Sequence, residues 1–256
     1  MKTKLTIFAV FSIALLISGC SAVSNLRLNE ELTNLYSAKI DAKDSEDVIL
    51  QETVAEALNS LAIRAETLAK QSKEPVDAIS FYRIAATAAW QGRSENVADL
   101  SEEGWKICDD SGVETAPRDC MMLLVIPDLA ATDALTMRLE KANQEVRKQR
   151  SLPDEQQSAT RLNELKEGSI EIFDSLANRF KALGDSKAKF SAVSVPPPLA
   201  ERMNTNLNFI FCQMRVANGT LLVAAGDEDP GYRARKKRLE EIRVTHDPNN
   251  QINCAT

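Results

Sequence analysis

Apolar side chains recur at intervals of three and four residues along most of this chain, as they do on one face of an α-helix. Two such stripes near its start are formed by Leu28, Leu32, Leu35 and Tyr36, and by Val54, Leu58, Leu61, Ala62, Ala65 and Leu68. A third helix is predicted from Pro75 to Trp90, followed by Gly92, because proline favours the first turn of a helix and glycine the position after its end. A fourth is predicted over residues 95–108.

Six consecutive apolar residues, Met121 to Ile126, follow Pro117 and suit either a buried strand or a buried helix. Pro127 comes directly after them and the surrounding segments have helical spacing, so a buried and kinked helix is favoured. Ala134 to Lys148 then predicts a more polar helix.

Two long helices are predicted in the second half, joined by the rigid run Pro196 to Pro198 and packed as an antiparallel hairpin. Their apolar faces consist of Leu162, Leu165, Ile172, Leu176, Phe180 and Leu183, and of Leu199, Met203, Leu207, Ile210, Met214, Ala217 and Leu221. A basic helix from Tyr232 to Val244 and an irregular tail complete the chain. The sequence therefore predicts an all-α fold without a significant β-sheet. We expect a helical-hairpin domain over 28–150 and a long hairpin with the basic helix over 151–256, or one continuous domain.

Residues 1–19 differ from the rest of the chain. Lys2 and Lys4 precede a mostly apolar run of 13 residues from Leu5 to Ile17. This run is shorter than the about 20 residues that a stable membrane-spanning helix needs. A positive start followed by a short apolar region is typical of a secretory signal peptide.

The end of this segment reads Leu16-Ile17-Ser18-Gly19-Cys20, in which aliphatic residues and two small residues precede a cysteine. It resembles the lipobox of bacterial lipoproteins. The resemblance implies that the chain is cut before Cys20, that the Cys20 thiol carries a diacylglyceryl group and that the new amine is acylated. The alternatives are an ordinary secretory signal with an incidental cysteine and a short N-terminal anchor helix.

Lipidation of Cys20 implies firm attachment to a membrane, because two or three acyl chains hold a protein where a single chain does so only marginally. Lipoproteins kept in the inner membrane of Gram-negative bacteria often carry Asp where this chain has Ser21. The resemblance therefore favours the outer membrane and a position facing the periplasm. Helical patterning begins near Leu28, so residues 20–27 are expected to form a tether of at most about 28 Å.

Charge and composition exclude several classes of function. The chain has 37 acidic and 31 basic residues, and its net charge of −6 becomes −8 when Lys2 and Lys4 leave with the signal peptide. An acidic body argues against general binding of nucleic acids. With a single histidine and no recognisable catalytic or dinucleotide-binding motif, the sequence singles out no catalytic, cofactor-binding or metal-binding residue.

Four cysteines remain after lipidation, and an even number in an exported chain favours two disulfides. Cys108 and Cys120 flank turn-forming residues, and Cys254 can join the tail to Cys212 within an apolar helix. We predict the pairs Cys108–Cys120 and Cys212–Cys254 in a structural role. Buried free thiols and a zinc site are the alternatives, and zinc is disfavoured because the chain lacks closely paired cysteines and neighbouring histidines.

A hairpin motif occupies residues 78–105. Phe81, Ile84 and Ala85 are an aromatic, an aliphatic and a small residue at helical spacing, Gly92 marks a turn, and Ala98 follows. This pattern resembles a tetratricopeptide repeat if Ala98 is shifted by one residue, although no second copy lies at the period of about 34 residues. Any alanine-rich hairpin is the alternative. The resemblance implies a diverged array of helical hairpins, a class that binds peptides or protein helices on its concave face.

Two charged groups are candidates for function. The strongest basic run consists of Arg233, Arg235, Lys236, Lys237 and Arg238, and it suits lipid phosphates, lipopolysaccharide or an acidic partner. Pairing with Glu240 and Glu241 one helical turn later is the alternative. The acidic group consists of Glu164, Glu167, Glu171 and Asp174, which could hide a catalytic carboxylate pair but whose spacing favours a solvated helix face.

Together these observations predict a non-enzymatic helical lipoprotein, anchored to the membrane through Cys20. We expect it to bind a protein partner of the bacterial envelope, as a scaffold in assembly or secretion. An envelope hydrolase acting on peptidoglycan or lipid and a lipid- or glycolipid-binding module are the alternatives.

Overall fold

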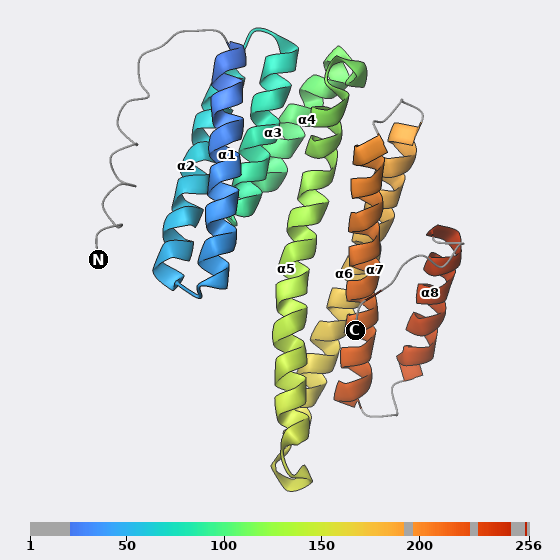
Figure 1. The fold of residues 1–256 in the computed structure, drawn as a ribbon. Coiled ribbons are helices and arrows are strands. Elements are labelled where there is room, and N and C mark those ends of the chain that lie inside the picture. Colours follow the sequence, from blue (N-terminus) through green and yellow to red (C-terminus); the bar gives the residue numbers. More distant parts are fainter. Residues whose placement is uncertain (1–20, 192–196, 226–229, 247–253, 255–256) are drawn as a thin grey trace.

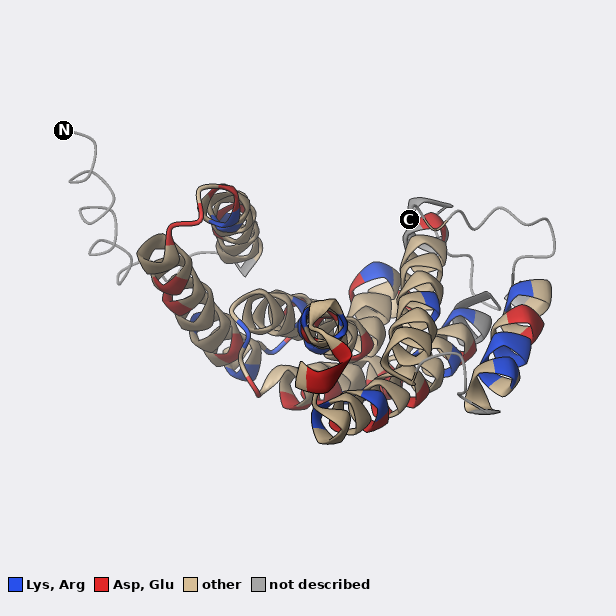
Figure 2. Ribbon diagram, turned by 90° about the horizontal axis from the view of Figure 1, so that it is seen from below, with Lys and Arg blue, Asp and Glu red and all other residues tan. Residues whose placement is uncertain are grey.

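A computed structural model describes residues 21–191, 197–225 and 230–246 together with Cys254. Its α-helices are α1 (Ser21–Asp44), α2 (Val48–Gln71), α3 (Pro75–Gln91), α4 (Val97–Ser111), α5 (Pro117–Ser151), α6 (Ala159–Ser191), α7 (Pro197–Ala225) and α8 (Pro230–His246). Short 3₁₀ turns occupy Val113–Thr115 and Asp154–Gln156, and these described residues include no strand. The helices lie side by side in a curved array with α8 at its outer edge (Figure 1, Figure 2). The prediction of an all-α fold is confirmed.

The ends of α2 and α3 follow from local chemistry. Asp47 precedes α2, and its side chain accepts a hydrogen bond from the Leu50 N–H at 3.1 Å, as an N-cap residue does. Pro75 begins α3 and Gly92 follows its last residue, as the sequence predicts. A side chain at Gly92 would collide with Asn59 of α2, so glycine allows the end of α3 to approach α2 closely.

Helix α1 begins at Ser21, so the predicted tether over 20–27 is wrong for every residue of it that the structure describes. The apolar stripe starts only at Leu28, but Asn25 already donates a hydrogen bond to the Ser80 hydroxyl of α3 at 2.6 Å. Polar contacts therefore hold the first turns of α1 against α3. The spacing of apolar residues cannot predict such contacts.

Helix α5 is a single helix of 35 residues with Pro127 inside it. The sequence pattern predicts separate helices before and after Pro127, and in the structure they form one helix. Proline removes one backbone hydrogen bond from a helix. Here Ile126 and Leu129 on either side are buried, and α5 contacts α3 and α4 as well as α6 and α7. Burial against four helices holds the segment helical across the proline.

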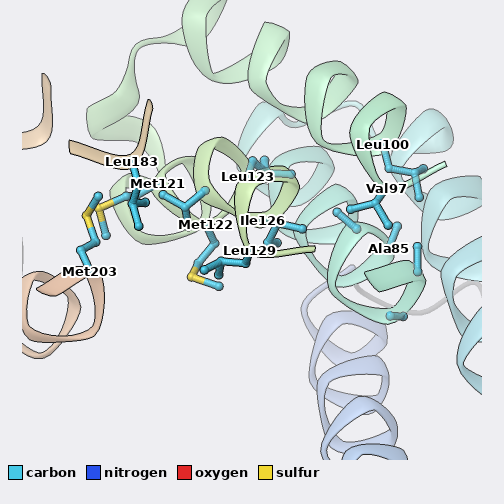
Figure 3. Close-up of a cluster of buried hydrophobic side chains, with 14 of the residues drawn as sticks. Ala85, Val97, Leu100, Met121, Met122, Leu123, Ile126, Leu129, Leu183 and Met203 are labelled. Atoms are coloured by element: carbon cyan, nitrogen blue, oxygen red, sulfur yellow. The ribbon is translucent and has the colours of Figure 1, made fainter. Parts of the chain in front are cut away.

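One hydrophobic core runs from Leu28 of α1 to Leu239 of α8. In Figure 3, Met121 of α5 lies beside Leu183 of α6 and Met203 of α7, while Leu123 points toward α4. The main buried cluster contains residues from both sides of residue 150.

Helices α6 and α7 pack along each other and run in opposite directions (Figure 1). The prediction of a long antiparallel hairpin is confirmed, and α8 corresponds to the predicted basic helix. The predicted apolar faces are buried wherever their side chains are described, among them Leu176, Ile210 and Met214. Leu199 has no described side chain.

Helices α3 and α4 form the hairpin of the 78–105 motif. Ala85 is fully buried, as the small position of the motif requires. Val97 is buried and Ala98, which matches the motif only after a shift of one residue, is exposed. Helix α4 begins at Val97, and its first residue already faces the core.

Candidate functional site

A cavity of about 530 Å³ opens between the first turns of α1, the first half of α3 and the start of α5. We call it the Arg83 pocket; its walls are Leu26, Asn29, Ser80, Arg83, Ala116, Arg118 and Asp119. Its lining residues include ones from the first turns of α1 and α5, and Figure 1 shows that both helices begin at the upper end of the molecule.

A chain of amide hydrogen bonds builds one wall of the pocket. The Nδ2 of Asn25 donates to the Ser80 hydroxyl at 2.6 Å, and the Nδ2 of Asn29 donates to the Asn25 carbonyl at 2.9 Å. The Nη2 of Arg83 donates to Oδ1 of Asn29 at 2.6 Å. Because Asn25 and Asn29 are four residues apart, they share the side of α1 that faces α3.

Arg83 supplies the main charge of the pocket. Its side chain is only 16% exposed, and its Nε lies 3.1 Å from Oδ1 of Asp119, whose side chain is 20% exposed. Burial lowers the pKa of Arg83, the Asp119 carboxylate opposes this change, and Arg118 adds to it. Arg118 itself is exposed. Two guanidinium groups and one carboxylate therefore leave the pocket with an excess positive charge.

The start of α5 adds to this positive character. Pro117 occupies the first turn, and Ala116 before it has no side chain that can cap the helix. The first N–H groups of a helix have no partner within the helix, and they carry the positive end of its dipole. Cys120 in this turn is joined to Cys108 of α4, which fixes this wall of the pocket to the hairpin.

Both predicted disulfides are present. Cys108 is bonded to Cys120 and Cys212 to Cys254, with Cα–Cα distances of 5.8 and 5.4 Å. The predicted pairings are confirmed. Cys20 lies outside the described residues, so its lipidation stays a prediction.

The structure divides the predicted basic cluster of α8. Arg235 donates from Nε to Oδ1 of Asn218 on α7 at 3.0 Å, and burial lowers its pKa. Arg238 pairs with Asp174 of α6 at 3.2 Å, and Lys237 lies 3.8 Å from Glu241. Three of the five basic residues in this cluster therefore contact other side chains of the protein itself.

Arg233 and Lys236 of the same cluster are exposed, on the helix where Figure 2 shows basic residues concentrated. Glu240 pairs with Arg243 of its own helix. The pairing with Glu240 and Glu241 that the sequence suggested therefore holds for Glu241 in its contact with Lys237, and Glu240 has a different partner.

The acidic group of α6 forms an exposed face, as its spacing favoured. Glu164 pairs with Arg161 at 2.9 Å and Glu171 with Arg138 at 3.2 Å, while Glu167 is exposed. Among the described side chains, no group of three or more His, Cys, Asp or Glu residues is arranged to hold a metal ion.

A second cavity of about 520 Å³ lies at the opposite end, around Arg150. The Nε and Nη2 of Arg150 donate to the backbone oxygens of Val223 and Ala224, each at 2.9 Å. Arg150 therefore satisfies the last carbonyls of α7, a structural role common at helix ends.

Sequence reasoning missed every charged residue of the Arg83 pocket. One signal was present: Arg83 is the only charged residue between Asp77 and Arg93 in an otherwise apolar, alanine-rich helix. A lone charge in such a helix is buried with a partner or lines a cavity. The partner, Asp119, is distant in the sequence and had no comparable signal.

Two helical segments, Pro117–Ser151 and Met203–Ala225, are long and apolar enough to cross a membrane by composition. Half of the most apolar window of each is buried inside the protein. Core helices of soluble proteins meet the same criterion, and both segments belong to the common core.

Comparison of the chain with protein-family models, curated proteins and solved structures yields no significant match.

Proposed function

We propose that this protein is an envelope lipoprotein, anchored through Cys20, whose helical body binds a partner protein at the membrane surface. The lipobox-like residues before Cys20 support the anchor. Two disulfides support an oxidising compartment, because such bonds are rare in proteins kept in a reducing cytosol. Helix α1 begins at Ser21, so the folded body would follow directly after the proposed anchor residue.

One surface observation carries the binding role. Thr33, Tyr36 and Ile40 lie on one side of α1 at spacings of three and four residues, and all three are exposed. We call them the α1 row. Tyr36 and Ile40 are each nearly half exposed, at 47% and 45%. Exposed apolar residues gathered on one surface are characteristic of protein-binding sites.

The spacing of the α1 row suits a helical partner. Positions separated by three and then four residues form the contact stripe of two helices packed along each other. Tyrosine is among the residues that contribute most to binding energy at protein interfaces. We therefore propose that a helix of an envelope protein, with apolar residues at the same spacing, packs against the α1 row.

Site-specific crosslinking in living cells tests this binding role. A photoreactive phenylalanine derivative at Tyr36 is expected to give a discrete adduct with an envelope protein. The same group at Asn34, which is also exposed but lies on another side of α1, is the matched control and should give none. Identical adducts at both positions, or no adduct at Tyr36, would contradict the proposal.

The anchor has a separate test. Replacement of Cys20→Ser should abolish incorporation of labelled palmitate, leave the signal peptide uncleaved and move any processed protein out of the membrane fraction. Ser21→Asp should keep the lipid but shift the protein toward the inner membrane, as the lipoprotein resemblance implies. Normal cleavage of the signal peptide in Cys20→Ser, together with no palmitate label on the wild-type protein, would reject lipidation of Cys20.

A further inference from the structure

The Arg83 pocket is placed and charged in a way that the binding of a partner helix to the α1 row does not explain. The pocket adjoins the first turns of α1, whereas the α1 row occupies later turns toward the opposite end of that helix (Figure 1). A ligand other than the partner helix is therefore needed to explain the positive charge of the pocket.

Its charged groups suit a single negative group. Asp119 balances one guanidinium, and Arg118 contributes a second one at the exposed side of the pocket. The start of α5 supplies backbone N–H groups without a side-chain cap on the same wall. Guanidinium groups bind phosphate oxygens with charge-assisted hydrogen bonds, and Ser80 offers a further hydroxyl among the lining residues.

The position of the pocket near the start of α1 indicates which molecule supplies the negative group. Leu26 lines it and lies five positions after Ser21, the first residue of α1, which corresponds to about 7.5 Å along the helix, and Cys20 directly precedes Ser21 in the sequence. Leu26 is 69% exposed, and Val23 one turn earlier is 46% exposed. If Cys20 is lipidated as proposed above, these apolar side chains and the pocket lie at the depth of lipid headgroups.

We propose that the Arg83 pocket binds the phosphate group of an anionic membrane phospholipid. The headgroup phosphate contacts Arg118 and the buried Arg83, and the exposed Leu26 lies against the lipid chains. This contact orients the protein on the membrane, which the flexible acyl chains of the anchor alone do not do. The inference rests on the proposed anchoring at Cys20.

A chemical-shift titration of the side-chain Nε–H signals of Arg83 and Arg118 tests the proposal in the full mature protein. The probes are glycerophosphoglycerol, glycerophosphocholine and inorganic phosphate, which are soluble and do not depend on the anchor. We expect both arginine signals to shift with glycerophosphoglycerol. Glycerophosphocholine should bind more weakly, because its trimethylammonium group is repelled by the excess positive charge.

Variants assign the binding to this pocket. Arg118→Gln changes an exposed side chain and should weaken glycerophosphoglycerol binding by roughly tenfold, the loss of one charge-assisted hydrogen bond. Arg27→Gln removes an exposed arginine of α1 that does not line the pocket, and it should bind as the wild type does. The double change Arg83→Gln and Asp119→Asn removes the ion pair without leaving an unpaired charge, and it should abolish binding.

Several outcomes would overturn the inference. Equal loss in Arg27→Gln and Arg118→Gln would indicate only a general charge effect, and inorganic phosphate binding as tightly as glycerophosphoglycerol would indicate a site for the free anion. Absence of binding while Cys20 is labelled normally would reject the pocket assignment and leave the anchor standing. Headgroup binding without lipidation of Cys20 would reject the membrane placement.

Discussion

Helices α1–α4 and helices α6–α8 pack in different ways, although they share one core. In the first group, α3 is the centre and contributes small side chains: Ala85, Ala86, Ala88 and Ala89 are all fully buried. In the second group, large side chains such as Phe173, Phe180 and Phe211 fill the space between long helices. Small residues bring backbones close together, and large ones keep them apart.

This difference in packing determines which polar side chains can form hydrogen bonds and ion pairs between helices. Close helices allow short side chains such as Asn25 and Ser80 to reach each other across α1 and α3. In the second group, long side chains such as those of Arg235 and Arg238 bridge between helices. The first region is therefore expected to tolerate added atoms poorly, and the second to depend more on long-range connections.

The largest expected effect comes from the disulfide of the second region. Replacing Cys212 and Cys254 by alanine should lower the free energy of unfolding by about 4 kcal/mol, because the bond joins residues 42 positions apart. The same change at Cys108 and Cys120, 12 positions apart, should cost about 3 kcal/mol. Urea unfolding monitored by circular dichroism gives both values. The reverse order would show that loop size in the unfolded chain does not control these stabilities.

Two glycines in helices compare the packing directly. A Cβ at Gly104 of α4 would lie 2.7 Å from the Cβ of Tyr82 and from Cδ1 of Leu123, whereas a Cβ at Gly168 of α6 meets nothing within 4 Å. Gly104→Ala should destabilise the protein by about 2 to 3 kcal/mol through overpacking. Gly168→Ala should stabilise it by about 0.5 to 1 kcal/mol, because alanine favours helix. Thermal unfolding of the two variants gives the comparison, and equal effects would contradict it.

Ion pairs should show the same contrast. Arg83→Gln leaves Asp119 mostly buried without its charged partner and is expected to cost about 2 kcal/mol. Arg238→Gln disrupts an ion pair with Asp174 whose side chains are about half exposed, at 45% and 58%, and should cost about 0.5 kcal/mol or less. Chemical denaturation at low and high salt checks both, since only the exposed pair should weaken strongly with salt. Similar costs for both variants would argue against a buried role for Arg83.

An effect smaller than that of Arg83→Gln concerns Tyr82, whose hydroxyl donates to Oε2 of Glu103 at 2.7 Å. Tyr82→Phe should cost about 1 kcal/mol near neutral pH. Burial, aided by Glu103, raises the pKa of Tyr82 above its usual 10.0. The folded protein therefore keeps this proton where the unfolded chain loses it. The stability that Tyr82 contributes is present below pH 10 and lost as the pH rises further.

The advantage of the wild type over Tyr82→Phe should accordingly shrink above pH 10. Unfolding free energies of both proteins between pH 8 and about 11 measure this change. A constant difference across that range would show that Tyr82 ionises equally in the folded and unfolded states.

Periodicity predicted most of the helices because burial follows it closely. Val54, Leu58 and Leu61 recur at helical spacing and are buried. It failed at the first turns of α1, where Asn25 and Asn29 hold the helix in place by hydrogen bonds. It also separated the two parts of α5, because a proline rule based on local geometry does not include burial against four neighbours.

The Arg83 pocket was less predictable than the fold. Arg83 was visible as a lone charge in an alanine-rich helix, but Asp119 is 36 positions away and became its partner only through the packing of α5 on α3. The disulfides were predictable because the predicted export of the chain and its even number of remaining cysteines favoured two bonds. Pockets depend on the relative placement of helices, which spacing along one helix does not encode.

Helix α1 begins at Ser21, directly after Cys20 in the sequence, and this bears on how far the folded body would extend from an anchor at Cys20. Helix α5 begins at the same end of the molecule and continues for 35 residues, about 52 Å, to the turn at its far end (Figure 1). If Cys20 carries the proposed anchor and α5 stands along the membrane normal, that turn would lie roughly 50 Å from the lipid surface. The protein would then work as a spacer, whose far tip meets only those structures that lie at that distance from the membrane.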